Sequence, residues 1–229
     1  MLNYLRFLLG KRHRPLRRSR YRFSRDRSHL LENARTVALV GNGPASPSMR
    51  AAIDQADIVI RFNLAPNSAA TGTRTDAHVL MNHDQPRFAR PAHLLNPDVF
   101  RSAREIWLPI DPEIMNAIER RDPSRGPSLL NWTHSICARH GRTKKLFVIP
   151  AHIHAEACRL VSPHLPGATV IEPSSGFLAI VYTFWCNPAV TLHLFGFTHQ
   201  GWDGHPWEAE RQAVDQYVAA GRILRHSMS

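Results

Sequence analysis

Residues 36–49 read TVALVGNGPASPSM, and this stretch decides the fold class. Thr36–Val40 is nearly all apolar, which is typical of a buried parallel strand, and Gly41-Asn42-Gly43 follows it as a tight turn. Ser46 is a predicted N-cap with a proline at the first helical position, so we expect a helix to about Gln55. A strand, a glycine turn and a helix in this order are the start of an α/β domain.

The rest of the chain continues the alternation of strands and helices. Short runs rich in apolar residues are predicted strands: Asp57–Phe62, Ala77–Met81, Glu105–Leu108, Lys145–Ile149 and Val190–Phe197. Longer segments are predicted helices: Pro112–Arg120, Ser128–Arg139, Ala151–Leu160, Ser174–Trp185 and Pro206–Ala220. Asp84–Asn96 is expected to be a long loop near the site. We therefore predict one α/β domain, with a three-layer, Rossmann-like and mostly parallel sheet.

The positive charge is concentrated at the start of the chain. The 229 residues include 29 Lys and Arg against 18 Asp and Glu, a formal net charge of +11. Residues 1–35 hold 11 of the basic residues and only two of the acidic ones, so nearly all the net charge lies there. We expect residues 1–35 to be a basic, disordered tail and residues 36–229 to be the globular domain. A nearly neutral body argues against a nucleic-acid partner.

The first residues suggest no membrane span and no secretory signal. No run approaches the ~20 apolar residues that a span needs, and no cleavage site follows the short apolar start. Residues 1–30 are either a soluble arm or a contact with an anionic membrane surface. Cys137, Cys158 and Cys186 form no C-x-x-C and no zinc spacing. We expect a cytoplasmic protein with reduced cysteines. If residues 1–30 contact an anionic membrane, the protein would be peripheral at the inner membrane surface.

Two candidate ligand-binding signals lie in the first half. Glycines at positions 41 and 43 would let the backbone approach a phosphate, with a helix start beside it. Ser46 stands where a dinucleotide site has its third glycine, and Arg61 where it has an acidic ribose ligand, so NAD is disfavoured. Asn63 could donate to and accept from a ribose or a base. A simple strand-ending turn also accounts for Asn63.

Two further signals lie in the second half. Ser174-Ser175-Gly176 begins an apolar helix and could bind an anion, although an ordinary N-cap explains it too. His205 stands just before a helix that carries Glu210. A histidine there could accept a proton from a reacting group, or it could merely cap the helix.

The four signals, taken in order, resemble glycosyltransferase family 29, the sialyltransferases. Val40-Gly41-Asn42-Gly43 with Arg61-Phe62-Asn63-Leu64-Ala65-Pro66 resembles the large sialyl motif of that family. Pro173-Ser174-Ser175-Gly176 with Leu192–Phe197 resembles the small motif. His205 and Glu210 have the spacing of the very small motif, and Gly221 follows the helix as in family members.

The resemblance implies an inverting, metal-independent transferase with a variant of the GT-A fold. It would move sialic acid or a related sugar acid from a CMP-sugar donor to a hydroxyl of a glycan acceptor, without a cofactor. Donor contacts are expected from Gly41, Asn42, Gly43 and Asn63 to the CMP part, and from Ser174, Ser175 and Gly176 to the phosphate. His205 would be the base, Glu210 would support the fold, and His199 and Trp202 would contact donor or acceptor.

The chain also departs from the family pattern. Animal members join the two large motifs by a disulfide, but only Cys186 has a possible counterpart here, and the first strand has no cysteine. His205 stands only eight positions after Phe197, so the aromatic third motif is not evident. We therefore expect a bacterial-type member without the membrane anchor.

Two alternatives remain open. His152 and His154 imitate an H-x-H metal site, although no set of downstream ligands completes it and no Asp-x-Asp occurs. A non-catalytic nucleotide-sugar-binding protein, docked by its basic tail to a membrane or nucleic acid, is the competing hypothesis.

Overall fold

The structure is a computed structural model that describes residues 23–226, except 67, 85–95, 122–129 and 166–171. Its main sheet has seven parallel strands in the order β7-β5-β3-β2-β1-β8-β9. The strands are β1 Thr36–Val40, β2 Ile58–Phe62, β3 Ala77–Val79, β5 Glu105–Leu108, β7 Lys145–Val148, β8 Thr191–Phe195 and β9 Ile223–His226. The predicted α/β fold with a parallel sheet is confirmed.

Helices connect these strands. They are α2 Arg50–Gln55, α3 Pro97–Ser102, α4 Pro112–Arg121, α5 Thr133–His140, α6 Ala151–Val161, α7 Ser175–Cys186 and α8 Trp207–Ala219. Short 3₁₀ turns cover His29–Leu31, Pro47–Met49 and Ser162–His164. A small antiparallel pair, β4 His83–Asp84 and β6 Leu130–Asn131, lies outside the main sheet.

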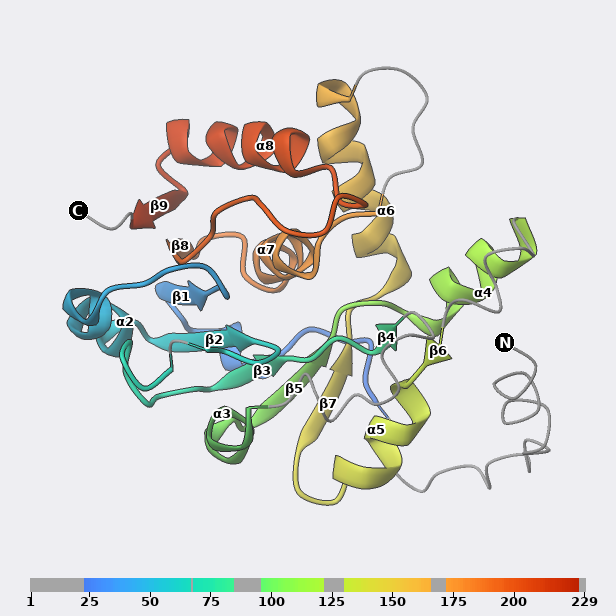
Figure 1. The fold of residues 1–229 in the computed structure, drawn as a ribbon, viewed down its shortest axis with the longest axis horizontal. Helices are drawn as coiled ribbons and strands as arrows, with labels where there is room; N and C mark the ends of the chain where they lie inside the picture. The colour runs from blue at the N-terminus through green and yellow to red at the C-terminus, as the bar shows by residue number, and fades with distance from the viewer. Residues whose placement is uncertain (1–22, 67, 85–95, 122–129, 166–171, 227–229) are drawn as a thin grey trace.

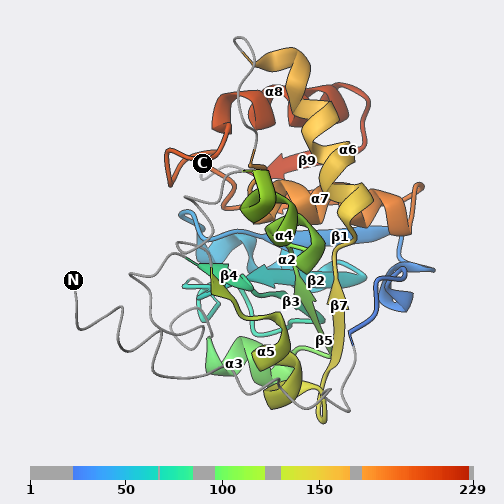
Figure 2. The ribbon, with the colours of Figure 1, turned by 90° about the vertical axis from the view of Figure 1, so that its right-hand side faces the viewer.

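The helices form two layers, one on each face of the sheet. Figures 1 and 2 show α6, α7 and α8 on one side and α3 and α5 on the other. Strand β1 shows how the layers arise, because its side chains alternate between the two faces of the sheet. Val37 and Leu39 pack in the core with α6, α7 and α8, and Ala38 and Val40 pack on the other face with α2. Buried on both faces, the strand has the continuous apolar run of a parallel sheet.

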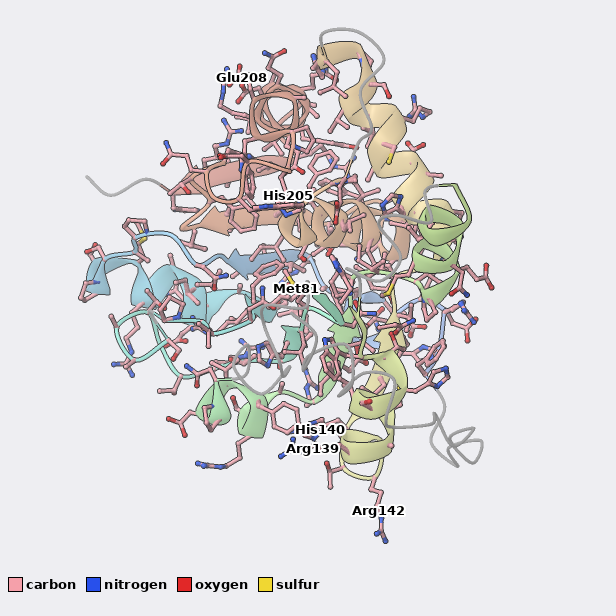
Figure 3. All side chains as sticks on the ribbon, turned by 45° about the vertical axis from the view of Figure 1, so that its right-hand side comes forward. Met81, Arg139, His140, Arg142, His205 and Glu208 are labelled. Carbon is pink, nitrogen blue, oxygen red and sulfur yellow. The ribbon has the colours of Figure 1, made fainter. Side chains whose placement is uncertain are left out.

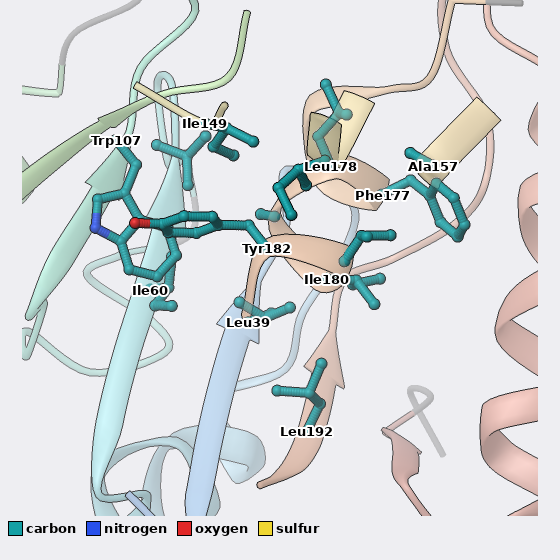
Figure 4. Close-up of a cluster of buried hydrophobic side chains, with 14 of the residues drawn as sticks. Leu39, Ile60, Trp107, Ile149, Ala157, Phe177, Leu178, Ile180, Tyr182 and Leu192 are labelled. Atoms are coloured by element: carbon teal, nitrogen blue, oxygen red, sulfur yellow. The ribbon is translucent and has the colours of Figure 1, made fainter. Parts of the chain in front are cut away.

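Helix α7 is the centre of the larger core. Every residue from Phe177 to Thr183 is buried, so this helix is apolar all round rather than amphipathic. The rings of Tyr182 and Trp107 meet edge-on at 4.9 Å between centroids, with Leu39 and Ile60 of the sheet beside them (Figure 4). This packing holds the beginning of α7 in a fixed place relative to the sheet.

The position of the site follows from the point at which the order of the strands across the sheet reverses. After β1 the chain builds β2 on one side, and β8 later pairs with β1 on the other side. Parallel strands end at the same edge, and open α/β sheets bind ligands at such a switch point. The segments after Val40, Phe62 and Phe195 therefore meet at one edge.

The predicted boundary between tail and domain lies too far along the chain. The backbone of Ser24 donates to Leu146 at 2.9 Å and accepts from Val148 at 2.8 Å, which adds a short segment to the sheet. Arg25 forms an ion pair of 2.6 Å with buried Asp111. The net charge of residues 1–35 gave no sign of these contacts. A basic residue that pairs with an acidic residue of the globular domain is part of that domain rather than of a free tail. Residues 1–22, which include most of the expected tail, lie outside the described residues.

The predicted strands and most helices are confirmed within a few residues. The helix expected at Ser128–Arg139 begins only at Thr133, and Leu130–Asn131 pairs as β6 instead. Strand β9 was missed because Ile223 alone in it is buried, so it has no alternating apolar pattern. The ends of the expected loop Asp84–Asn96 lie in β4 and at the N-cap of α3, and residues 85–95 lie outside the described residues. Within the described part of the chain, no helix is both long and apolar enough to cross a membrane.

Candidate active site

A cavity of about 360 Å³ lies at the edge where β1, β2 and β8 end. Every residue that the sequence predicted for the site lines it: Gly41, Asn42, Gly43, Asn63, Ser174, Ser175, Gly176, His199, Trp202 and His205. Sequence analysis missed other lining residues, among them Met81, Gly196, Phe197 and Trp207. Figure 3 shows His205 and Met81 near each other in the middle of the molecule, far from Arg139 and Arg142.

The turn after β1 is packed tightly against the end of β8. The amide of Gly41 donates to the carbonyl of Phe195 at 2.8 Å, and that of Gly43 to the carbonyl of Gly196 at 3.0 Å. A Cβ at position 43 would lie 2.5 Å from the Gly196 oxygen, and one at position 41 would lie 2.7 Å from it. These glycines therefore serve a close approach of two backbone segments, and their amides already have acceptors. The side chain of Asn42, exposed between them, is the polar group that this turn offers the cavity.

Asn63 is fixed at the end of β2 by its own hydrogen bonds. Its backbone is in the left-handed region, with φ 44°, and its Oδ1 accepts from the amide of Met81 at 2.9 Å. Burial lowers the pKa of His78 to about 4, so its ring is neutral, and Nε2 lies 2.8 Å from the Asn63 carbonyl as a donor. Oδ1 is thus occupied, which leaves the Nδ2 donor of Asn63 for a ligand. His78 is a positioning residue, and its place in a buried strand was the one signal for it.

The beginning of α7 presents open backbone donors. Ser174 is the N-cap, and its Oγ accepts from the amide of Phe177 at 3.2 Å. The next two amides, those of Ser175 and Gly176, have no hydrogen-bond partner among the described residues. They lie at the positive end of the helix dipole and at the cavity wall, which is the arrangement that favours an anion.

Ser174 itself is engaged with Glu210. Its amide donates to one carboxylate oxygen at 2.6 Å and its hydroxyl to the other at 2.7 Å. Glu210 is 1% exposed, and burial raises its pKa to about 7 although both Ser174 hydrogen bonds act in the opposite direction. Both donors of Ser174, which were expected to hold a phosphate, are therefore occupied by Glu210, whereas the helix start that Ser174 caps keeps open amides. Glu210 ties α8 to the beginning of α7.

His205 is anchored to the same segment. Its Nδ1 lies 2.8 Å from the carbonyl oxygen of Glu172. A carbonyl only accepts, so Nδ1 carries the hydrogen, and the neutral form of the ring has its lone pair on Nε2. The rings of Trp202 and Trp207 stand edge-on to the imidazole, each at 5.0 Å between centroids. A fixed imidazole whose neutral tautomer has its lone pair on Nε2 is the geometry of a general base.

His199 is the second histidine of the cavity. It has a φ of 49°, and burial lowers its pKa to about 4, so the ring is neutral. Its Nε2 is buried without a hydrogen-bond partner among the described residues. Trp202, three residues on, is 42% exposed.

The H-x-H alternative receives no support from the described residues. His152 packs edge-on against Trp185 at 5.0 Å, and Nδ1 of His154 lies 3.6 Å from the sulfur of Cys158. The described part of the chain contains no group of three or more His, Cys, Asp or Glu placed to hold a metal ion. Cys137, Cys158 and Cys186 are free thiols.

Comparison with known proteins identifies the family. The family model for glycosyltransferase family 29 (sialyltransferase) matches residues 22–220. The chain belongs to this family. It is a sialyltransferase-like glycosyltransferase, and the resemblance seen in the motifs is confirmed.

Individual relatives agree in fold. The crystal structure of a mammalian sialyltransferase superposes with a TM-score of 0.51 at 17% identity, over 89% of this chain and 74% of that one. A second mammalian structure, in complex with Gal-beta-1-3GalNAc-ortho-nitrophenol, gives 0.51 at 18% identity, over 89% and 75%. The urease operon 23 kDa accessory protein of Rhizobium meliloti (strain 1021) is 29% identical over 204 residues, 85% of this chain and 94% of that one.

Proposed function

We propose that this glycosyltransferase transfers sialic acid or a related sugar acid from a CMP-sugar to a hydroxyl of a glycan acceptor, with inversion and without a metal ion. One observation carries the proposal. The residues 172–174 hold both the imidazole of His205, through the Glu172 carbonyl, and the open start of α7, through Ser174 and Glu210. The imidazole of His205 and the open amides at the start of α7 thereby face one cavity, which is where a base and a phosphate site are needed.

Donor binding uses the two asparagines and the helix start. Asn42 and the Nδ2 group of Asn63 hold the cytidine part. The amides of Ser175 and Gly176 hold the phosphate, and they stabilise the charge that grows on it as the sugar leaves. Such preoriented dipoles do for the leaving phosphate what a cation does in other transferases.

The chemical step is a single displacement. Nε2 of His205 takes the proton of the acceptor hydroxyl while the oxygen forms a bond to the anomeric carbon. The bond from that carbon to the phosphate oxygen breaks, and its electron pair goes to CMP. The sugar passes through a state with oxocarbenium character.

The residues of the cavity support inversion. Retention by double displacement needs a protein nucleophile, usually a carboxylate. Among the described lining residues the carboxylate is that of Glu210, and it is buried with both oxygens bound to Ser174. It is not placed to attack a sugar.

A thermal-shift comparison of CMP, UDP, GDP and NAD tests the donor assignment. A ligand that binds only the folded state raises the melting temperature by mass action. We expect CMP to stabilise the protein and the other three to do so much less. Equal stabilisation by UDP, or none by CMP, contradicts the assignment.

Turnover separates this function from a binding protein without catalysis. We expect CMP release from a CMP-sugar that is faster with a glycan acceptor and that continues in EDTA. A protein that binds CMP but releases none from CMP-sialic acid or CMP-Kdo is the non-catalytic alternative. Activity that is lost in EDTA and restored by Mn²⁺ or Mg²⁺ contradicts the metal-free mechanism.

A further inference from the structure

We propose that a second cavity, at the other edge of the sheet from the candidate active site, binds a phosphate group. It has a volume of about 720 Å³ and lies where β5 and β7 begin, with Glu105 and Lys145 in its wall. The strands of the main sheet are parallel, so the beginnings of β5 and β7 lie opposite the edge where β1, β2 and β8 end. Figure 3 shows Arg142, another lining residue, far from His205. The described lining residues of the two cavities do not overlap, so this site is separate from the proposed transfer reaction.

Positive charge lines this cavity and is not balanced there. The described lining residues include one carboxylate, that of Glu105, and five cations: Arg101, Arg104, Arg142, Lys144 and Lys145. Glu105 is 2% exposed, and its Oε2 accepts from the hydroxyl of Ser28 at 2.6 Å and from the indole Nε1 of Trp107 at 2.9 Å. Its charge is thus bound inside the protein. A concave surface with charges of one sign concentrates ions of the other sign.

Two of the cations are held in place by the fold. The ammonium group of Lys144 donates to the carbonyl of Arg101 at 2.9 Å and to that of Ala103, which stabilises the end of α3. Burial lowers the pKa of Lys144, and an anion beside the ammonium group would offset this penalty. Nη2 of Arg104 donates to the carboxylate of Asp76 at 2.7 Å. Both positive groups are therefore preoriented at the cavity wall.

Arg142 and Lys145 have no such structural role. Both residues are exposed, and neither side chain has a hydrogen bond or an ion pair with another described residue. Arg101 has an exposed ion pair with Asp98, at 3.3 Å, and such pairs add little to stability. These three cations are therefore available to a ligand, next to the two that the fold holds in place.

The chemistry of these groups selects phosphate. A guanidinium group can bind two phosphate oxygens at once, and an ammonium group binds phosphate as a compact charge. The described lining residues include no aromatic ring that would stack on a base, so the phosphate itself is the part that the cavity recognises. A free phosphate compound and the headgroup of an anionic lipid both present this group.

The test must locate the anion, because residues 1–22 carry eight Arg and Lys and would attract any polyanion. Amide ¹H–¹⁵N spectra of the full-length protein are titrated with inorganic pyrophosphate, in wild type and in two double variants. The cavity variant is Arg142→Ala/Lys145→Ala. Its matched control is Arg35→Ala/Arg139→Ala, which also removes two exposed cations but none that lines the cavity.

We expect the amides of Gly141 and Thr143, in the cavity wall, to shift in wild type and in the control. Their apparent Kd should rise at least about tenfold in the cavity variant, because charge-assisted hydrogen bonds to the phosphate are lost. Sedimentation with vesicles of phosphatidylcholine, with or without phosphatidic acid, identifies the source. If the cavity variant binds the phosphatidic acid vesicles less than the control does, the phosphate is that of a lipid. Equal vesicle binding, together with the loss at Gly141 and Thr143, assigns a free phosphate compound.

The site is overturned if the cavity variant and the control agree both in vesicle binding and in Kd at Gly141 and Thr143. Pyrophosphate shifts confined to the amides of Ser175 and Gly176, with equal vesicle binding, would place the anion in the active-site cavity. That result contradicts the second site and leaves the proposed function intact.

Discussion

Two glycine-containing turns line the same cavity, one after β1 and one at the beginning of α7, and they use their backbone donors in opposite ways. In the first, the amides of Gly41 and Gly43 donate to carbonyls at the end of β8. In the second, the amides of Ser175 and Gly176 have no partner among the described residues. The first turn therefore uses its donors to pack two backbone segments together, whereas the second keeps its donors open for the proposed phosphate. A glycine turn after a first strand thus does not by itself bind phosphate, because its donors can be used within the fold.

The largest expected effect lies on the α7 side, at His205. His205→Ala removes the base, so turnover should fall by roughly 10²–10⁴. CMP affinity should stay near wild type, because the donor contacts are made elsewhere. Asn42→Ala, on the β1 side, should instead weaken CMP binding with a smaller loss of maximal rate. Steady-state kinetics and CMP titration on the same preparations compare the two, and normal turnover in folded His205→Ala would refute the assignment.

Gly43→Ala tests the packing role of the β1 turn. The new Cβ would meet the Gly196 carbonyl at 2.5 Å and Thr198 at 2.7 Å, so the backbone must shift. We expect a loss of about 1–3 kcal/mol in unfolding free energy, as for other overpacked sites. Gly176→Ala is the matched control, because the closest contact of its Cβ is the edge of the Phe197 side chain, at 3.0 Å, rather than backbone. Urea unfolding should show a smaller loss of unfolding free energy for Gly176→Ala than for Gly43→Ala. Equal losses would contradict the contrast between the two turns.

Glu210→Gln tests the tie between α7 and α8. Gln replaces one of the two acceptor oxygens by an NH2 donor, so a donor of Ser174 then faces another donor, at a cost of about 1–2 kcal/mol. The pKa of Glu210 is raised from 4.5 to about 7, so the folded protein holds a proton that the unfolded chain has released between these values. The contribution of Glu210 to the unfolding free energy of the wild type therefore falls as pH rises from 4.5 to 7.

Glu210→Gln has no titrating carboxyl at this position. Its loss of unfolding free energy relative to wild type should therefore be largest near pH 5 and smaller at pH 8. Urea titrations of both proteins at the two pH values measure this difference. A deficit that grows with pH would mean that the carboxylate is stabilised by its surroundings rather than penalised by burial.

The smallest effect is expected at Ser175. Ser175→Ala removes a hydroxyl but keeps the backbone donor, so CMP affinity should fall by less than about tenfold, the value of one hydrogen bond. The loss should appear for CMP and not for cytidine, because the group serves the phosphate. Calorimetric titration with both ligands checks this, and an equal loss for cytidine would place Ser175 at the nucleoside.

The sequence predicted which residues line the site better than it predicted the hydrogen bonds that those residues make. Residues of the three motifs were all expected at the edge of a parallel sheet, and they line one cavity there. The partners of Ser174 and Gly43 were not predictable, because Glu210 and Gly196 are far from them in sequence and meet them only through the packing of α8 and β8. The boundary at residue 35 failed for a similar reason, since Arg25 finds its partner at Asp111.

The most direct test of the contrast between the two turns is an amide ¹H–¹⁵N spectrum of the folded protein titrated with CMP and, separately, with cytidine. If α7 holds the phosphate, the amides of Ser175 and Gly176 should shift with CMP and much less with cytidine, whereas those of Gly41 and Gly43 should respond alike to both. Shifts that depend on the phosphate at Gly41 and Gly43, with Ser175 and Gly176 unmoved, would contradict the account.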